Sequence, residues 1–154
     1  MSGQLALGVV DYSGESNRKT DFLYRVSLKC LVQNSQGQVL LVKEGNRDWW
    51  DLPGGGMDHG ESIAASIARE LAEEVSLKGD FSYRIIAVEE PKLMSTQNIW
   101  QIRLVFKVEP TDFAVAAGVN ARSIEWLPAE SFKNSPHRVE RLVFRYYKLA
   151  QEKF

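Results

Sequence analysis

The sequence predicts a single α/β domain in which a mixed β-sheet carries a helix on each face. Two amphipathic segments predict the helices: one begins near Ser62, after a glycine-rich stretch, and the other begins near Ser135. Segments of alternating polarity predict the strands, the clearest at residues 99–108. Opposite faces of one sheet would bury the apolar stripe of both helices.

Composition agrees with one globular domain and excludes several classes of protein. The chain has 154 residues, 44% of them hydrophobic and 25% charged. A formal net charge of -1 argues against a general nucleic-acid or membrane-surface binder. The single cysteine, Cys30, excludes an internal disulfide and indicates a reducing compartment, so we expect a cytoplasmic protein. No apolar run approaches the ~20 residues of a membrane span, and the N-terminus lacks the pattern of a signal peptide.

The strands are predicted in chain order from alternation and turn chemistry. Residues 1–21 are interpreted as an arm or an edge strand, and residues 22–154 as the domain. Asn34-Ser35-Gln36-Gly37 is a turn sequence, so the segments around it predict a hairpin. The predicted strands are 23–32, 38–43, 81–89, 99–108 and 123–127, with loops at 90–97 and 111–122.

Each predicted helix has an apolar stripe. In the first helix, the stripe that should face the core is Ala64, Ile67, Ala68, Leu71 and Val75. In the last helix, Ser135-Pro136 suits the cap and first turn. Its polar side carries Arg138, Arg141, Arg145 and Lys148. These four cations predict a solvated face, with contact to RNA or phosphate as the alternative.

The chemistry of the chain is concentrated between Leu52 and Leu77. This stretch opens with proline and three glycines and continues into a helix that bears Glu70, Glu73 and Glu74. Residues at i, i+3 and i+4 are neighbours on a helix surface, so these three like charges repel. A divalent cation would compensate them, because Mg²⁺ and Mn²⁺ prefer carboxylate oxygens. The alternative is a solvated acidic face, as in most glutamate clusters.

The frame around the glutamates resembles the signature of the Nudix hydrolases (MutT-like). Five residues separate Gly55 from Glu61, seven more lead to Arg69, and Arg69 to Leu77 follows without a gap. The one departure is Ser76, where the family has a glycine that ends the helix. Either serine adopts the left-handed turn, or the turn shifts toward Gly79. The resemblance implies the Nudix fold, a three-layer α/β/α sandwich with a mixed sheet.

The resemblance also implies roles for the motif residues and a Mg²⁺ cofactor, with Mn²⁺ as the substitute. Glu73 and Glu74 would be the principal metal ligands, assisted by the carbonyl of Gly54 or Gly55. Glu70 would be a further ligand or the general base, Arg69 would hold the cluster in place, and Glu61 would pair with it. The motif covers only about a sixth of the chain.

Residues outside the motif are weaker candidates. Family members often recruit another acid from the loop before a late tryptophan, but residues 113–123 contain none. The nearest acids are Asp112 and Glu125, and the other candidates are Glu89, Glu90 and Glu109. Both histidines, His59 and His137, are interpreted as non-catalytic. We expect substrate contacts from Arg47, Trp49 and Trp50 just before the motif, although core packing would also explain the tryptophans.

The resemblance predicts a metal-dependent pyrophosphohydrolase for a nucleoside triphosphate, or for a nucleoside diphosphate linked to another group. Pro91 lies near the position where ADP-ribose-cleaving members tend to have proline. Two alternatives remain: a non-hydrolytic nucleotide-sensing module, suggested by Ser76 and by the absence of acids at 113–123, and a hydrolase of RNA 5′ ends, suggested by the basic last helix. We expect a small-molecule partner rather than nucleic acid or membrane. Homodimers are common in the family.

Overall fold

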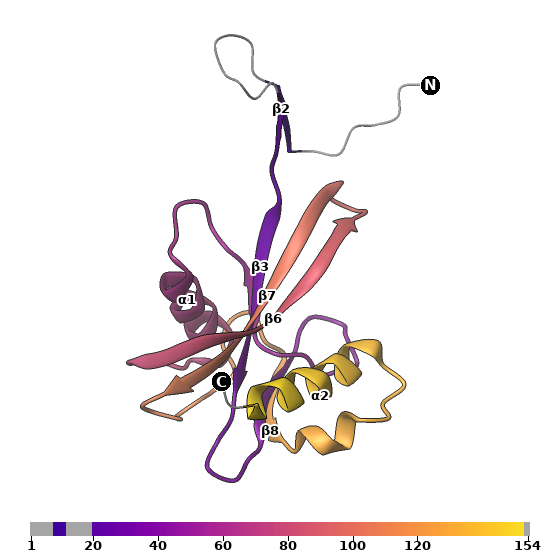
Figure 1. Ribbon diagram of the computed structural model, residues 1–154. Coiled ribbons are helices and arrows are strands. Elements are labelled where there is room, and N and C mark those ends of the chain that lie inside the picture. Colours follow the sequence, from indigo (N-terminus) through magenta and orange to yellow (C-terminus); the bar gives the residue numbers. More distant parts are fainter. Residues whose placement is uncertain (1–7, 12–19, 153–154) are drawn as a thin grey trace.

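A four-stranded mixed sheet forms the centre of the protein. The computed structural model describes residues 8–11 and 20–152. The sheet has the order β5-β3-β7-β6, in which β3 and β7 run parallel and the outer pairs are antiparallel (Figure 1). Its strands are β3 (Arg25–Val32), β5 (Gly54–Gly56), β6 (Phe81–Met94) and β7 (Ile99–Pro110).

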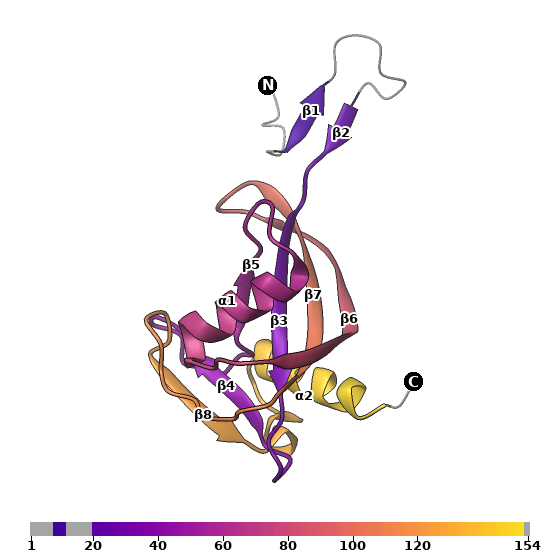
Figure 2. The same cartoon turned by 90° about the vertical axis from the view of Figure 1, so that its left-hand side faces the viewer.

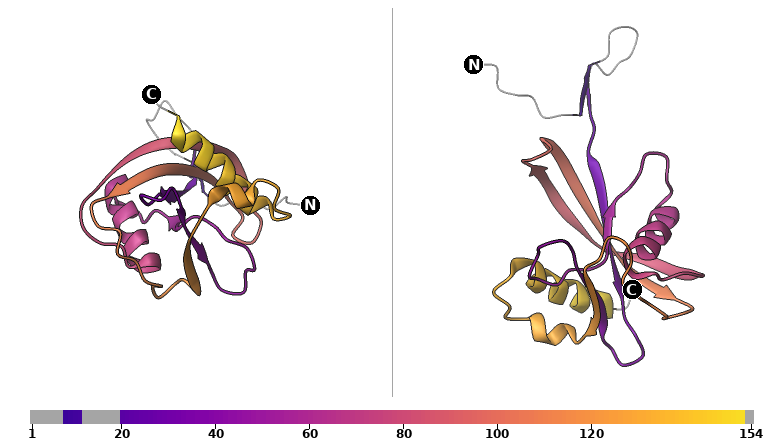
Figure 3. Two further views of the ribbon diagram at one scale, coloured as in Figure 1. Left: turned by 90° about the horizontal axis from the view of Figure 1, so that it is seen from below. Right: turned by 180° about the vertical axis from the view of Figure 1, so that it is seen from behind.

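Two helices cover opposite faces of this sheet. Helix α1 (Ile63–Val75) lies on one face and α2 (Arg138–Gln151) on the other, as Figure 3 shows. The predicted three-layer α/β/α arrangement is therefore confirmed. Strand β3 separates two hydrophobic cores because its side chains alternate: Cys30 packs into the core under α1, and Leu31 packs into the core under α2.

The turn and both strands of the hairpin predicted at residues 23–43 are present, but the two strands do not pair along their length. Strand β4 (Val39–Lys43) pairs with β8 (Ser123–Leu127) in a separate two-stranded sheet. Only one bridge, between Gln33 and Val39, joins it to the end of β3. Val39–Val42 are buried on both faces, with Leu40 in the core under α1 and Leu41 in the core under α2. A strand that supplies both cores lies across the end of the main sheet rather than at its edge.

Strands β6 and β7 form a long hairpin that extends beyond the predicted limits. The loop predicted at 90–97 is a strand up to Met94, and the turn occupies the four residues after it. The register of the two strands shifts between Glu89 and Lys92, where Pro91 lies. Proline has no N–H to donate to the neighbouring strand, so it is accommodated at such an irregularity.

The last helix also begins later than predicted. Its first residue is Arg138 and its N-cap is His137, after a short 3₁₀ helix, η1 (Ala129–Phe132). Ser135 lies before the helix, where its hydroxyl accepts a hydrogen bond from the backbone N–H of His137 and donates one to Glu140. The serine therefore orients the entry to α2 without capping it.

Strands β1 (Val9–Asp11) and β2 (Thr20–Phe22) form a two-stranded ribbon that projects from the body (Figure 2). Most of the arm or edge strand predicted at 1–21 lies outside the described residues, so that interpretation remains a prediction. Among the residues described, no helix is long and apolar enough to cross a membrane.

Helix α1 ends at the position that the motif predicts. Ser62 is the N-cap, and its hydroxyl accepts a hydrogen bond from the N–H of Ala65. The helix ends at Val75, and Ser76 takes the left-handed conformation with φ 54°. The turn therefore has not shifted to Gly79; serine occupies a conformation that favours glycine.

This observation predicts that Ser76→Gly stabilises the protein. Relief of the left-handed strain should exceed the extra chain entropy of glycine and raise the free energy of unfolding by about 0.5 to 1 kcal/mol. Urea denaturation would measure the change. The matched control is Ser82→Gly, at an exposed position in β6 that has no positive φ. Glycine there should lower the free energy of unfolding, and a gain at both positions would contradict the explanation.

Candidate active site at the glycine strand and helix α1

The glycine strand β5 allows helix α1 to approach the sheet closely. Gly54, Gly55 and Gly56 pair with Lys29, Leu28 and Ser27 of β3. A Cβ atom at Gly55 would lie 2.6 Å from Oε1 of Glu70. A Cβ atom at Gly56 would overlap the guanidinium of Arg25 on the opposite face of the sheet. Side chains at these two positions would displace charged groups. A Cβ atom at Gly54, which has φ 148°, would overlap the backbone carbonyl of Leu28, so Gly54 is the position that requires glycine.

The buried face of α1 differs from the predicted stripe. Ile67, Leu71 and Val75 are fully buried as expected, whereas Ala64 is half-buried and Ala68 is exposed. In place of the alanines, the row Ser66, Glu70 and Glu74 is buried. This row follows one side of the helix and brings two of the three motif glutamates toward the glycine strand.

Arg69 holds the motif carboxylates together. Its Nε and one terminal nitrogen each donate to Glu61 at 2.8 Å, and the same terminal nitrogen donates to the carbonyl of Gly56 at 3.0 Å. The other terminal nitrogen donates to Glu70 at 3.0 Å and lies 3.5 Å from Glu73. A bidentate pair of this kind is stronger and more directional than a surface ion pair. The arginine–glutamate pair implied by the resemblance is therefore present.

Glu61 is locked in its ionised form. The hydrogen bonds from Arg69 are the main cause and the backbone N–H of Asp58 the next, and together they lower the pKa of Glu61 to about 2. Its Oε1 also accepts a hydrogen bond from Ser66 at 2.8 Å. Glu61 thereby links the loop before α1 to the second turn of the helix, which fixes the direction of the Arg69 side chain.

Glu74 is a buried carboxylate with no cation in contact. Its side chain accepts hydrogen bonds from the N–H of Gly54, at 3.3 and 3.4 Å. Burial raises its pKa to about 8; nearby Lys29 opposes this shift, while Glu44 and Glu70 add to it. Lys29 itself forms an ion pair with Asp51 at 3.1 Å and donates to the carbonyl of Leu52. Within the described part of the chain, no ion pair neutralises Glu74.

The donor set matches a hard divalent cation, although the carboxylates do not converge in the structure as it stands. Glu70 is held by Arg69, Glu73 is exposed and Glu74 faces Gly54. Among the described residues, no group of three Asp, Glu, His or Cys side chains is close enough to hold a metal ion. Carboxylate oxygens on adjacent helix turns, one of them buried without a counter-charge, are nevertheless the ligands that Mg²⁺ prefers.

The loop at 111–122 supports the end of the helix. The N–H groups of Ala116 and Gly118 donate to the carbonyls of Val75 and Glu74 at the C-terminus of α1. A Cβ atom at Gly118 would overlap the carbonyl of Glu73. This loop satisfies carbonyls that a helix end leaves free, so its contribution to the site is backbone support rather than an acid.

The candidate acids outside the motif have other roles or lie elsewhere. Asp112 accepts a hydrogen bond from the N–H of Ala114 in its own loop. Glu109 lies 3.4 Å from Lys107, and Glu125 is exposed on β8. Glu89 and Glu90 lie on β6 and line a cavity against α2.

The three predicted substrate-binding residues lie in the β4–β5 connection. Within this connection, one bridge joins Asp51 to Val42 of β4. The Trp49 ring packs against His137, with centroids 5.7 Å apart. The Lys43 ammonium lies over the Trp50 ring, 4.7 Å from the ring centroid, and the backbone N–H of Trp50 donates to the Glu140 carboxylate. Arg47 pairs with Glu44 at 3.3 Å. The structure thus uses Trp50 in packing and brings Trp49 to the start of α2.

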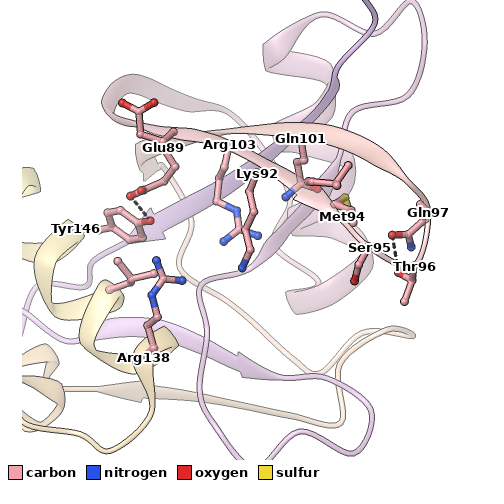
Figure 4. A pocket seen from close by; sticks show the side chains of 13 residues that line it. Glu89, Lys92, Met94, Ser95, Thr96, Gln97, Gln101, Arg103, Arg138 and Tyr146 are labelled. Atoms are coloured by element: carbon pink, nitrogen blue, oxygen red, sulfur yellow. Dashed lines mark hydrogen bonds between the residues drawn. The ribbon is translucent and has the colours of Figure 1, made fainter. Parts of the chain in front are cut away.

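Sequence reasoning missed a cavity of about 380 Å³ between the β6–β7 hairpin and α2. Figure 4 shows that the side chains of Lys92, Arg103 and Arg138 point into it. Its walls come from segments far apart in the sequence, so no local pattern revealed it. The basic face predicted for the last helix, which includes Arg138, was the only signal.

Comparison with known proteins agrees with the site. The NUDIX domain family matches residues 23–148. A putative 8-oxo-dGTP diphosphatase of Bacillus subtilis (strain 168) is 30% identical over 105 residues, which are 68% of this chain and 67% of that protein. An RNA pyrophosphohydrolase of Ruthia magnifica subsp. Calyptogena magnifica is 41% identical over 69 residues, which are 45% of this chain and 37% of that protein. The chain thus spans about two thirds of the first relative and less than half of the second.

Solved structures share the fold. A MutT protein from Methanosarcina mazei Go1 has a TM-score of 0.68 at 23% identity, covering 84% of this chain and 96% of that chain. The NUDIX domain of Shewanella oneidensis NrtR, solved with ADP ribose, has a TM-score of 0.65 at 17% identity, covering 84% and 90%. Fold and motif together define a hydrolase of the class that acts on phosphoanhydrides. The chain belongs to the Nudix family.

The Arg69–Glu61 pair predicts a specific dependence of stability on pH. The folded-state pKa of Glu61, about 2, lies below its ordinary value of 4.5. The stabilisation from the pair is therefore fully present above about pH 4.5 and is lost as the pH falls toward 2. Urea denaturation should show that the free energy of unfolding of wild type exceeds that of Glu61→Gln by a constant amount from pH 5 to 8. This difference should become smaller as the pH falls below 5.

The control for this comparison is Glu125→Gln, at an exposed position on β8. It should show almost no difference from wild type at any pH. A Glu61→Gln difference that does not change between pH 5 and pH 3 would contradict the ionic character of the pair.

Proposed function

We propose that the chain is a divalent-metal-dependent pyrophosphohydrolase. Its substrate would be a nucleoside triphosphate or a nucleoside diphosphate linked to a further group, as in ADP-ribose. The observation that carries this proposal is the burial of Glu74 beside Gly54 without a cationic partner among the described residues. A buried unpaired carboxylate destabilises a fold, so it indicates a cation that binds there.

The side chains of Glu73, Glu74 and Glu70, with the carbonyl of Gly54 or Gly55, would hold the metal. A bound Mg²⁺ would neutralise charge on the phosphates and lower the pKa of a bound water; Mn²⁺ would substitute for it. Glu73 is the exposed member of the set and the one that solvent reaches most easily.

The neighbouring residues would position these carboxylates. Arg69 orients Glu70 through one oxygen, and the described residues offer no hydrogen bond to the other oxygen. That free oxygen supports either role for Glu70, metal ligand or general base. Glu61 keeps Arg69 directed at the cluster, and Gly55 leaves room for the Glu70 carboxylate against the strand. Water attack on a phosphorus atom needs this degree of orientation.

Two observations bear on the choice of substrate. The relatives named above are described as an 8-oxo-dGTP diphosphatase and as an RNA pyrophosphohydrolase, which supports a nucleotide carrying a 5′-phosphoanhydride. Pro91 lies exposed in the β6 irregularity, and its position there has a local structural reason. It therefore adds little to an ADP-ribose-like substrate, and cleavage of RNA 5′ ends stands as the second candidate.

The non-hydrolytic sensor is less well supported. Ser76, which suggested it, takes the left-handed turn that the motif requires, so the end of α1 keeps its geometry. The stretch without acids, residues 113–123, supports the helix through the backbone N–H groups of Ala116 and Gly118. Neither departure removes a carboxylate from the site.

Turnover tests the proposal directly. Wild type should release phosphate or pyrophosphate from one or more nucleotides only when Mg²⁺ or Mn²⁺ is present, measured with coupled phosphatase detection. Glu73→Gln should lower kcat/KM by at least about 100-fold, because it removes a proposed metal ligand. Glu125→Gln, on β8, should retain full activity. If wild type binds nucleotides but hydrolyses none of them, the proposed hydrolase activity is contradicted and the nucleotide-sensing module is supported.

Metal binding can be tested without any substrate. Mg²⁺ should raise the Tm of wild type relative to EDTA, since a ligand that binds only the native state stabilises it. Glu74→Gln should remove this shift, while Glu125→Gln should keep it. Because burial already disfavours the ionised form of Glu74, a neutral glutamine should leave the variant at least as stable as wild type in EDTA. A full Mg²⁺ shift in Glu74→Gln would exclude Glu74 as a ligand.

A further inference from the structure

The cavity between the β6–β7 hairpin and α2 has the size of a small-molecule site but an unusual charge. Its volume is about 380 Å³, within the range of ligand pockets. Apolar groups contribute to its lining, as in most ligand pockets, and three cationic side chains from three different elements join them. Lys92 belongs to β6, Arg103 to β7 and Arg138 to the first turn of α2.

The nitrogen atoms of these three side chains point toward a common space (Figure 4). Within the described residues, none of the three forms an ion pair; Arg103 has a single long hydrogen bond, 3.4 Å to the hydroxyl of Ser27. Like charges that face one another repel, and an anion between them would reverse the sign of that interaction. Two arginines and a lysine are the groups that bind phosphate.

Glu89 and Glu90 also line the cavity, but within the described residues neither forms an ion pair with these three cations. Glu89 accepts a 2.6 Å hydrogen bond from the hydroxyl of Tyr146 and lies 3.9 Å from Arg145, which is outside the cavity. Burial, with the Glu89 bond as a second cause, raises the pKa of Tyr146, so the phenol remains a donor to Glu89. Glu90 is exposed.

The cavity lies on the α2 face of the sheet, which is also the face on which Gly56 of the glycine strand lies. Arg103 is paired with Ser27, and Ser27 with Gly56, so the three residues form one row across β7, β3 and β5. Residues in register across a sheet share a face, and two strand spacings are about 10 Å. Arg25, whose guanidinium covers Gly56, lies two residues before Ser27 and continues this face. Cationic groups thus extend from the glycine strand to the cavity.

We propose that this cavity binds a second phosphate of the substrate, separate from the anhydride that is cleaved. The inference rests on the proposed function only in identifying the ligand as the substrate. Binding of a phosphate group is inferred independently, from Lys92, Arg103 and Arg138. The chemistry required is a phosphate monoester or diester carried on the nucleoside beyond its 5′-anhydride. A phosphorylated mononucleotide and an RNA chain both offer such a group. A substrate without this second phosphate would leave the three cations of the cavity without an anion.

Binding in EDTA tests the site separately from catalysis. Isothermal titration calorimetry would compare adenosine 3′,5′-bisphosphate with adenosine 5′-monophosphate, which differ only in the second phosphate. Wild type should bind the bisphosphate at least about tenfold more tightly, which corresponds to 1.4 kcal/mol. Lys92→Gln and Arg138→Gln should each reduce that ratio several-fold and leave the affinity for the monophosphate unchanged.

The matched control is Lys148→Gln, an exposed lysine on α2 outside the cavity. It should keep the wild-type ratio, which separates a local effect from the loss of one surface charge. Equal affinities for the two nucleotides in wild type would overturn the proposal. A ratio that survives both cavity variants would also overturn it, because the second phosphate would then bind elsewhere.

Turnover with metal identifies the source of the phosphate. Adenosine 5′-triphosphate would be compared with its 3′-phosphorylated form and with a 5′-triphosphorylated dinucleotide. A KM lowered about tenfold for the 3′-phosphorylated mononucleotide, and raised again in Lys92→Gln, would assign a phosphorylated small molecule. The same pattern for the dinucleotide alone would assign RNA. Tight binding of the bisphosphate without turnover of any substrate would contradict the proposed hydrolase activity and support the anion site. Turnover without any preference for a second phosphate would support the hydrolase activity and contradict the anion site.

Discussion

The close packing of α1 against the glycine strand is the constraint on which the rest of the site depends. Without side chains at Gly54–Gly56, the buried row of the helix can bring Glu70 and Glu74 against the edge of the sheet. Burial there removes water from carboxylates that repel one another, which is costly unless cations answer the charge. Arg69 compensates the negative charge of Glu61 and Glu70, but Glu74 lacks a cationic partner among the described residues.

This asymmetry gives the two halves of the cluster different roles. The Arg69–Glu61 pair is bidentate, hydrogen-bonded to the backbone and stable across the usual pH range, so it acts as a fixed support. Glu74 has the opposite properties: burial raises its pKa, and its hydrogen-bond donor among the described residues is the backbone N–H of Gly54. A rigid support beside a carboxylate that lacks a counter-charge is the arrangement on which the proposed metal site rests.

The central strand β3 links this cluster to the other side of the molecule. Its alternation separates the two cores, with α1 over one and α2 over the other. On the α2 side, Ser27 connects the row of Gly56 to Arg103 and hence to the basic cavity. The cavity exists because β6 continues past Glu89 and shifts its register at Pro91, which extends the hairpin alongside the start of α2. A substrate that spans both regions would meet carboxylates at one end and cations at the other.

The sequence by itself determined the parts of this protein that depend on local spacing. The start of α1 near Ser62 and the positions of its glutamates follow from local spacing, and the resemblance to the Nudix signature implied the Arg69–Glu61 pair; all appear in the structure. Tertiary structure alone decided the partner of β4, the burial of Glu74 and the basic cavity. Each of these depends on which segments meet across the fold, and hydrophobic alternation does not specify the partner that a strand or a helix face will contact.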